Sequence, residues 1–188
     1  MTATTPDWSA LPMPVDDGAA RHLAGMRLPS VPLPATDGST VDLSALPGRV
    51  VIYAYPRTAD PDSGSPEGWD AIPGARGCTP QSCAFRDHFT ALQALGVTCL
   101  FGLSTQATAY QQEAASRLHL PFPLLSDAGL ALAGASRLPV FIAGGMTLLR
   151  RLTLVLDSGV VRQVFYPVFP PDRNAADVMA WLAGPGLA

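Results

Sequence analysis

The sequence predicts a three-layer α/β domain in which helices cover both faces of a mixed β-sheet. Two continuous apolar runs, residues 50–55 and 97–103, have the β-branched and aromatic character of strands that are buried on both faces. Towards the C-terminus, residues 151–156 and 160–165 predict two more strands, joined by a hairpin turn at residues 157–159. Helix-forming segments lie between these strands, so helices are expected on both sides of one sheet.

Length and composition favour one globular domain. The 188 residues are 48% hydrophobic and 14% charged, with a net charge of −3 and a pI near 5.4. A role with nucleic acid or an anionic membrane therefore has no electrostatic support. No apolar run approaches the roughly 18 residues of a spanning helix, and residues 1–24 lack the pattern of a signal peptide. Three cysteines do not make a disulfide framework, and a reducing cytoplasm is the expected location.

The N-terminal part is expected to be less regular than the rest. Residues 1–25 contain several prolines and little periodicity, which predicts a flexible extension draped over the surface, with Trp8 or Leu11 as a docking side chain. Residues 26–188 are expected to form the domain itself. Its first element is predicted to be a short hairpin within residues 27–46.

A long loop and several helices complete the prediction. Residues 57–76 are rich in proline, glycine and serine, and a loop of this length in a compact domain is usually functional. An ordered flap beside the site is therefore favoured over a tolerated surface insertion. Further helices are predicted over residues 106–118, from a Ser126-Asp127 cap to about residue 135, and over residues 175–182.

The most informative stretch is residues 77–87, with the sequence GCTPQSCAFRD, which opens an amphipathic helix. Pro80 suits the first helical position, and Thr79 before it is expected to be the N-cap. Apolar residues then recur on one helical face at positions 85, 89, 92 and 95. Gly96 is expected to end the helix in a left-handed conformation.

Two cysteines of this stretch are candidates for chemistry. Cys78 lies at the N-terminal end of the helix, where the helix dipole favours an anion and hence a thiolate nucleophile. In an intact helix the Cα of Cys83 would lie about 8–9 Å away, beyond the roughly 7 Å that a disulfide tolerates. A bond between them would need the first turn to unwind, which suits a transient catalytic disulfide. On spacing alone, two buried and inert cysteines are an equally good interpretation. Cys99, within a predicted strand, is expected to be packed and inert.

Together with the strand that ends in Tyr53-Ala54-Tyr55-Pro56, residues 77–87 resemble a peroxiredoxin, with most similarity to the bacterioferritin-comigratory-protein (Q-type) branch. The resemblance implies a thioredoxin-like fold. It covers roughly residues 27–185, apart from the 57–74 loop and the 143–149 region, and its further matching segments are residues 96–97, 102–104, 122–127 and 151–157.

The resemblance implies a thiol-dependent peroxidase that needs no cofactor or metal. Cys78 would be the peroxidatic cysteine, which hydrogen peroxide or an organic hydroperoxide oxidises to a sulfenic acid. Cys83 would be the resolving cysteine, forming an intramolecular disulfide that thioredoxin or a similar dithiol reduces. Arg151 would favour the thiolate and polarise the peroxide O–O bond, whereas Arg150 is expected to face solvent. The chain is expected to act as a monomer or homodimer.

The resemblance also implies that Pro56, Gly77 and Thr79 border the substrate, with Pro56 shielding the cysteine. The chain departs from the family pattern at Ala75, where a threonine or serine hydroxyl would contact the peroxide. Thr58, brought back by the long loop, and Thr79 are the two candidates to replace that hydroxyl. The departure predicts weaker activity or an unusual substrate.

Two other functions remain open from the sequence. A thioredoxin-like disulfide oxidoreductase is disfavoured because the cysteine spacing is not Cys-x-x-Cys. A non-enzymatic redox sensor is consistent with the change at Ala75. A metal site made of Cys78, Cys83 and His88 is rejected because steps of five cannot share one helical face. Gly144-Gly145 is interpreted as a turn, since a phosphate-binding loop needs a lysine and other spacing.

Overall fold

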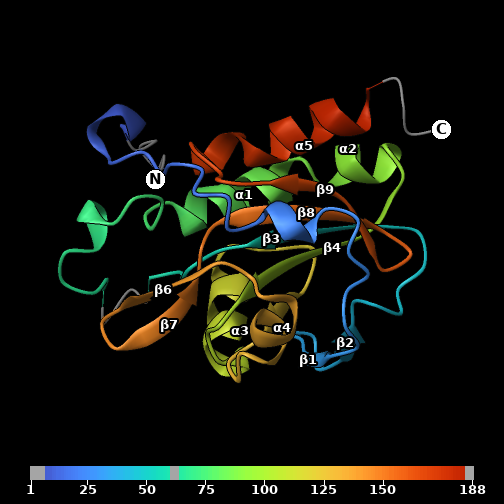
Figure 1. Ribbon diagram of the computed structural model, residues 1–188, viewed down its shortest axis with the longest axis horizontal. Helices are drawn as coiled ribbons and strands as arrows, with labels where there is room; N and C mark the ends of the chain where they lie inside the picture. The colour runs from blue at the N-terminus through green and yellow to red at the C-terminus, as the bar shows by residue number, and fades with distance from the viewer. Residues whose placement is uncertain (1–6, 60–63, 185–188) are drawn as a thin grey trace.

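The computed structural model describes residues 7–59 and 64–184 and has the predicted three layers (Figure 1). A five-stranded sheet with the order β5-β4-β3-β8-β9 forms the middle layer. Strands β3, β4 and β5 run parallel, and β8 is antiparallel to both β3 and β9, so the sheet is mixed. The bounds are β3 Arg49–Ala54, β4 Val97–Ser104, β5 Leu124–Ser126, β8 Leu152–Asp157 and β9 Val160–Phe165.

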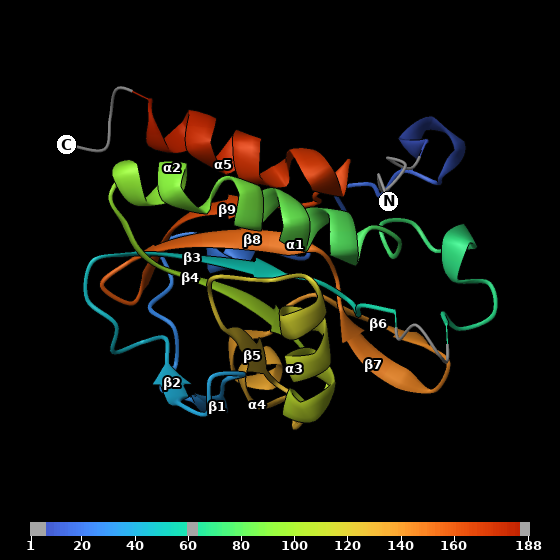
Figure 2. The same ribbon diagram turned by 180° about the vertical axis from the view of Figure 1, so that it is seen from behind.

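Helices cover both faces of this sheet (Figures 1 and 2). Helices α1 (Cys78–Asp87), α2 (Phe89–Ala94) and α5 (Asn174–Leu182) lie on one face, and α3 (Thr108–Arg117) and α4 (Ala131–Ser136) lie on the other. Strand β3 separates two cores because its successive side chains point to opposite faces. Its alternate residues 51 and 53 pack with α1, α2 and α5, whereas residues 50, 52 and 54 pack with α4.

Two small hairpins flank the sheet. The first, β1 (Pro32–Pro34) with β2 (Thr40–Asp42), confirms the predicted hairpin. The second, β6 (Val140–Ala143) with β7 (Met146–Leu149), was not predicted beyond its Gly144-Gly145 turn. Both glycines have positive φ, as a two-residue hairpin turn requires. Strand β5 was also not predicted, because three residues are too short to show a strand pattern.

The cysteine helix begins earlier than predicted. Cys78 is its first residue and Gly77, with φ of +108°, is the N-cap, so the prediction of Thr79 as N-cap is wrong. Glycine adopts this backbone conformation readily, which allows the chain to enter the helix directly. Pro80 still lies in the first turn, where its missing N–H costs no helical bond. Gly96 has the predicted positive φ.

The helix is also interrupted once. His88, with φ of −100° and ψ of 6°, separates α1 from α2. Backbone bonds from His88 N to Ala84 O and from Leu92 N to His88 O continue across the break. The apolar face therefore survives, and Phe85 and Leu92 are completely buried as predicted.

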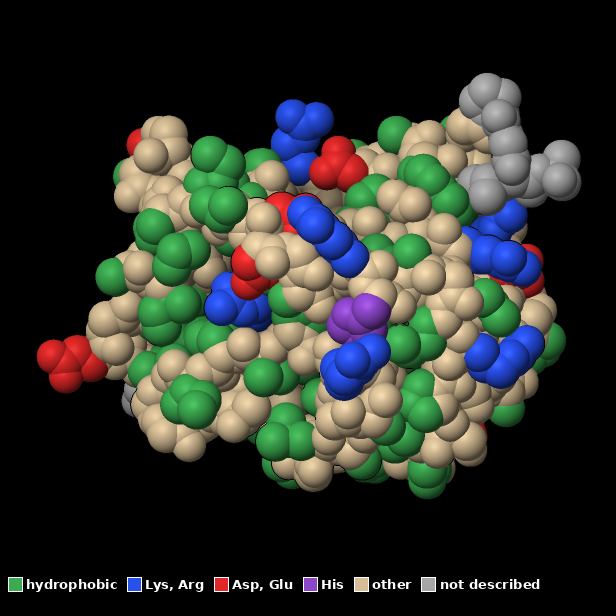
Figure 3. Space-filling model, in the orientation of Figure 1, with side chains coloured by type: hydrophobic (Ala, Val, Ile, Leu, Met, Phe, Trp, Pro, Cys, Tyr) green, Lys and Arg blue, Asp and Glu red, His purple; other side chains and the backbone are tan. Residues whose placement is uncertain are grey.

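The remaining helices agree with the sequence prediction within a few residues. Helices α3 and α5 match their predicted spans. Helix α4 starts at Ala131, later than predicted, although the Asp127 carboxylate does accept bonds from the backbone N–H groups of Leu132 and Ala133 at 3.1 and 2.8 Å. Within the described residues, none of these helices has the length and apolar character needed to cross a membrane. On the face shown in Figure 3, acidic and basic side chains are interspersed.

The N-terminal segment is more closely joined to the domain than predicted. Ala20 and Leu23, which belong to the expected extension of residues 1–25, are buried in the core beside α4. Trp8 docks as expected: its Nε1–H donates to Asp172 at 2.8 Å. Trp8 and Leu23 lie in short 3₁₀ helices, Trp8–Ala10 and Arg21–Leu23. Elements this short have no periodic sequence pattern from which they could be predicted. Residues 1–6 of the expected extension and residues 60–63 of the expected loop lie outside the described residues.

Candidate active site

Cys78 lies at the N-terminal end of α1 and is 4% exposed. Its Sγ accepts a hydrogen bond from Nη2 of Arg151 at 3.2 Å and lies 3.6 Å from the carbonyl oxygen of Ala75. Cys78 and Arg151 are 73 positions apart in the sequence. The fold brings them together by placing the start of α1 next to the start of β8. A cationic donor and a helix N-terminus therefore both meet at one sulfur, and both stabilise negative charge there.

Arg151 directly precedes β8 and is also 4% exposed. Its other acceptors are the backbone carbonyls of Gly74, Ala75 and Arg76, at 3.2–3.3 Å, and the Oε1 of Gln81. All of these acceptors are neutral, and among the described residues no carboxylate forms an ion pair with this guanidinium. A buried charge without a counter-ion is costly, and the Cys78 sulfur is the group beside Arg151 on which negative charge would offset that cost.

A buried polar chain continues from Arg151 and was not predicted. The Gln81 amide nitrogen donates to Oδ1 of Asn174 at 2.9 Å, and the Thr153 hydroxyl donates to the same oxygen at 2.6 Å. Gln81 could have been found from the sequence, because a residue three places after Cys78 lies on the same side of the helix. Asn174 starts a distant helix, and no local signal connects it to the cysteine.

A cavity of about 750 Å³ opens beside Cys78. Of the predicted substrate-binding residues, Gly77 and Thr79 line it, whereas Pro56 is buried at the end of β3 and is not part of its wall. The 3₁₀ helix Trp69–Ala71 of the predicted flap forms one side. Apolar groups of the wall come from Pro66, Trp69 and Ala71, and charged groups come from Arg57 and from the ion pair of Arg76 with Asp70.

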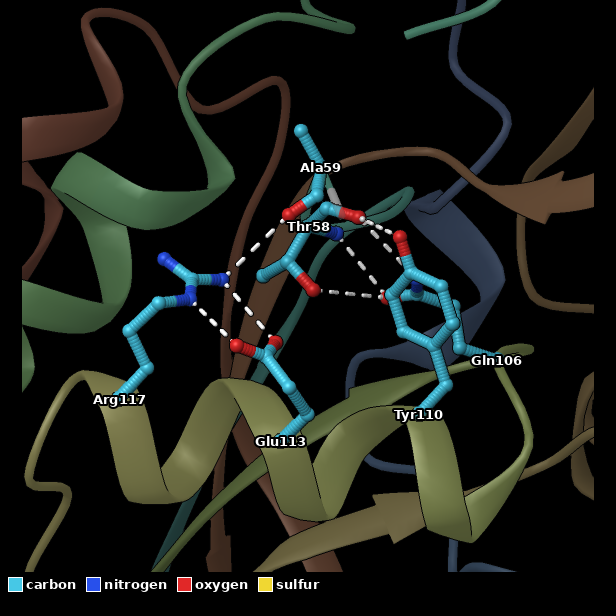
Figure 4. A network of polar contacts seen from close by, with 6 residues as sticks. All are labelled: Thr58, Ala59, Gln106, Tyr110, Glu113 and Arg117. Atoms are coloured by element: carbon cyan, nitrogen blue, oxygen red, sulfur yellow. Dashed lines mark hydrogen bonds and ion pairs between the residues drawn. The ribbon is translucent and has the colours of Figure 1, made fainter. Parts of the chain in front are cut away.

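Thr58 is not part of the wall of this cavity, and its side chain points towards Gln106 (Figure 4). Its hydroxyl and its backbone N–H both donate to Oε1 of Gln106, at 3.3 and 3.0 Å. Its carbonyl oxygen accepts bonds from Gln106 Nε2 and from the Tyr110 hydroxyl. The hydroxyl of Thr58 is therefore committed to the region around α3, and of the two predicted candidates only Thr79 lines the cavity with Cys78.

The same network holds the first residues of the long loop. The carbonyl of Ala59 accepts a bond from Arg117 at 3.4 Å, and Arg117 pairs with Glu113 on α3 (Figure 4). Ala75, at the other end of the loop, is completely buried beside Trp69 and Leu148 in a small separate core. At Ala75, where the family resemblance implies a threonine or serine hydroxyl, the chain therefore has a methyl group packed against apolar side chains.

Cys83 has a different environment from Cys78. It is half-buried on the intact helix α1, and all three cysteines are free thiols. Burial raises the pKa of the Cys83 thiol, and the nearby positive charge of Arg86 opposes that rise. Cys99 on β4 packs against the core beside α4, as predicted. Among the described residues, no group of three or more His, Cys, Asp or Glu side chains converges as a metal site would require.

Comparisons with known proteins identify relatives of the whole domain. The Redoxin family model matches residues 23–179. A putative chloroplastic peroxiredoxin Q of Oryza sativa subsp. indica is 32% identical over 183 residues, which cover 94% of this chain and 76% of that protein. The chloroplastic peroxiredoxin Q of Populus jackii is 32% identical over 160 residues, or 84% of this chain and 67% of that protein.

Solved structures with the same fold are also found. Peroxidoxin BcpB from Mycobacterium tuberculosis superposes with a TM-score of 0.68 at 26% identity, covering 85% of this chain and 95% of that protein. The bacterioferritin comigratory protein of Xanthomonas campestris, studied for its alkyl peroxide reduction activity, has a TM-score of 0.67 at 23% identity over 85% of this chain and 96% of that protein. At 23% identity, the similarity to the Xanthomonas campestris protein shows that the fold is shared and no more.

Proposed function

This chain belongs to the peroxiredoxin Q branch of the Redoxin family and is a thiol-dependent peroxidase, and we propose that Cys78 is its peroxidatic cysteine and Cys83 its resolving cysteine. The observation that carries the assignment is the buried guanidinium of Arg151, 3.2 Å from the Cys78 sulfur and without a carboxylate partner among the described residues.

The first step is oxidation of Cys78. Its thiolate attacks one oxygen of the hydroperoxide, so an S–O bond forms while the O–O bond breaks. The sulfur becomes a sulfenic acid, and the departing oxygen takes up a proton and leaves as an alcohol, or as water when the substrate is hydrogen peroxide. Arg151 donates to the sulfur in the reduced state, and its guanidinium would stabilise the charge that develops on the peroxide oxygens.

The second step forms the disulfide. The Cys83 thiol loses its proton and attacks the sulfenic sulfur of Cys78. An S–S bond forms while the S–O bond breaks, and the departing hydroxide takes up a proton, equivalent to the one lost by Cys83, and leaves as water. Both residues lie on an intact helix, with Cα atoms about 8–9 Å apart. The first turn of α1 must therefore unwind before this bond can form. A dithiol then reduces the disulfide and restores both thiols; thioredoxin is the reductant that we propose.

The cavity suggests which groups meet the substrate. We assign the Thr79 hydroxyl to the peroxide, since Thr79 lines the cavity whereas Thr58 does not. Because about 750 Å³ far exceeds the size of hydrogen peroxide, we propose that organic hydroperoxides are accepted as well. Pro56 would act through the end of β3 rather than by direct contact with substrate. A cytoplasmic location and a monomeric or homodimeric state also stay predictions.

Intact mass spectrometry tests the proposed cycle. The reduced protein is mixed with one equivalent of hydrogen peroxide and then with thioredoxin, its reductase and NADPH. We expect a loss of two hydrogens that maps to a Cys78–Cys83 disulfide, followed by full recovery. Cys83→Ser should stop at one added oxygen on Cys78, and Cys99→Ser should behave like the wild type.

Other outcomes would identify the alternatives. Oxidation of Cys78 with Cys83 left free in the wild type would remove Cys83 from the cycle and favour a one-cysteine peroxidase or a sensor. Insulin reduction without peroxide consumption would favour a disulfide oxidoreductase. No reaction at Cys78 would refute the assignment.

A further inference from the structure

We propose that Asn174 and Thr153 are positioning residues for the peroxidase reaction, because they hold the Gln81 side chain in the one orientation that gives Nη1 of Arg151 an acceptor. The inference rests on the proposed function, since it concerns the residue that is assigned to the Cys78 sulfur. Neither Asn174 nor Thr153 lines the cavity beside Cys78, and neither is hydrogen-bonded to the Cys78 sulfur.

The four residues form a continuous buried chain of hydrogen bonds. Arg151 donates through Nη1 to Oε1 of Gln81, Gln81 donates through Nε2 to Oδ1 of Asn174 at 2.9 Å, and Thr153 donates to the same Oδ1 at 2.6 Å. Each of these side chains is at most 4% exposed. Water therefore cannot easily replace a missing hydrogen-bond partner. Loss of one bond in the chain is expected to weaken the orientation of the next side chain.

The chain has only one consistent direction. A guanidinium has five donors and no acceptor, so Gln81 must turn its oxygen towards Arg151. The amide nitrogen of Gln81 then faces Asn174, which must present its oxygen in return. With that oxygen fixed, the Thr153 hydroxyl acts as the donor. A reversed Gln81 amide would place donor against donor at Arg151 and acceptor against acceptor at Asn174.

The chain also joins three parts of the fold. Gln81 lies on α1, Asn174 starts α5, and Thr153 lies on β8, two residues after Arg151. The Nε and Nη2 groups of Arg151 have backbone carbonyls as acceptors, but the acceptor of Nη1 is the Gln81 side chain. Without a fixed Gln81, Nη1 has no fixed acceptor and the guanidinium is held only through Nε and Nη2, so the 3.2 Å contact of Nη2 with Cys78 is less tightly constrained.

Two substitutions at Thr153 separate positioning from packing. Thr153→Val keeps the shape but removes the hydroxyl, whereas Thr153→Ser keeps the hydroxyl but loses a buried methyl group. We expect Thr153→Val to lower the second-order rate of Cys78 oxidation by hydrogen peroxide about tenfold, the effect of one lost hydrogen bond in a positioned group. Thr153→Ser should stay within about twofold of the wild type although its melting temperature falls further.

Asn174→Leu gives the same test at the other residue, with Gln111→Leu as the matched control. Gln111 is a completely buried amide that donates to Ser104, to the carbonyl of Leu125 and to the Tyr55 hydroxyl, and none of these three partners is hydrogen-bonded to Arg151. We expect Asn174→Leu to slow Cys78 oxidation about tenfold, and Gln111→Leu to lower the melting temperature with little change in that rate.

The outcomes are distinguishable from failure of the proposed function. If wild-type Cys78 reacts with peroxide no faster than Cys99, the assignment of Cys78 itself fails. If wild-type Cys78 reacts fast and Thr153→Val matches it, only the positioning role is overturned. Equal losses in Thr153→Val and Thr153→Ser, or in Asn174→Leu and Gln111→Leu, would likewise overturn it by showing a general effect of packing.

Discussion

The two cysteines of α1 lie on one helix but in opposite environments. Cys78, at the first residue, is 4% exposed, bonded to Arg151, and backed by a chain of buried polar side chains. Cys83, five residues on, is half-buried, and its burial raises the pKa of its thiol. In the proposed cycle, this contrast would let one helix hold both a preorganised nucleophile and a second thiol that acts only after the helix changes shape.

The difference originates in what packs against each end of the helix. The Cys78 end meets Arg151, Pro171 and Trp8, which come from distant parts of the chain. A Cβ on Gly77 would lie 2.3 Å from Pro171 and 2.9 Å from the Trp8 ring, so this end is closely packed. In the proposed cycle, a rigid Cys78 site would favour attack on peroxide, while the disulfide with Cys83 would require that same packing to open.

Removing the guanidinium of Arg151 should have the largest effect on the difference between Cys78 and Cys83. We expect Arg151→Met to lower the second-order rate with hydrogen peroxide about 100-fold, as for loss of one charge-stabilising donor. Stopped-flow measurement of peroxide consumption checks this. Arg150→Met is the matched control, since Arg150 donates to the carbonyl of Val140 and is not part of the Cys78 site. Equal rates in the two variants would show that the charge beside Cys78 has no role.

Crowding the start of the helix should have a smaller but clear effect. Gly77→Ala combines a positive φ with overlap on Pro171 and Trp8, so we expect a loss of about 2–4 kcal/mol in the free energy of unfolding. Gly68→Ala is the control, because Gly68 also has positive φ but no neighbour within 4 Å of a new Cβ. It should cost about 1 kcal/mol. Urea denaturation measures both, and similar losses would contradict tight packing at Gly77.

The smallest effect concerns the ionisation of Cys83. A raised pKa means that less of the Cys83 thiol is ionised at neutral pH, so its alkylation in the reduced protein should be slower than that of a free cysteine and rise at more alkaline pH. Arg86→Met should raise the pKa further, because the charge of Arg86 lowers it. Peptide mass spectrometry of iodoacetamide labelling between about pH 7 and about pH 10 checks both expectations.

The raised pKa of Cys83 also determines how the free energy of unfolding changes with pH. Because the folded-state pKa of Cys83 lies above its unfolded value, the protonated thiol favours the folded protein. This contribution is complete below the unfolded pKa and is lost as the pH rises through the folded pKa. Cys83→Ser should therefore reduce the alkaline loss of stability, and an unchanged pH profile would argue against burial as the cause.

Much of the fold was predictable because its signals are local. Continuous apolar runs marked β3 and β4, and spacing at positions 85, 89, 92 and 95 marked the buried face of α1 and α2. Three features were missed for lack of a local pattern: strand β5 with three residues, the hairpin of β6 and β7, and the docking of residues 20–23 on the core. Short elements like these are stabilised by partners elsewhere in the chain.

The sequence by itself determined strands β3, β4, β8 and β9 of the central sheet, the position of Cys78 at a helix start, and the family resemblance that singled out Cys83 and Arg151. These depend on residue type and spacing along one stretch. Only the tertiary structure decided that Thr58 turns to Gln106, that Thr79 lines the cavity, and that Gln81, Asn174 and Thr153 continue from Arg151. Hydrogen bonds between buried side chains depend on directions in space, and residues up to 93 positions apart acquire those directions only when the three layers pack.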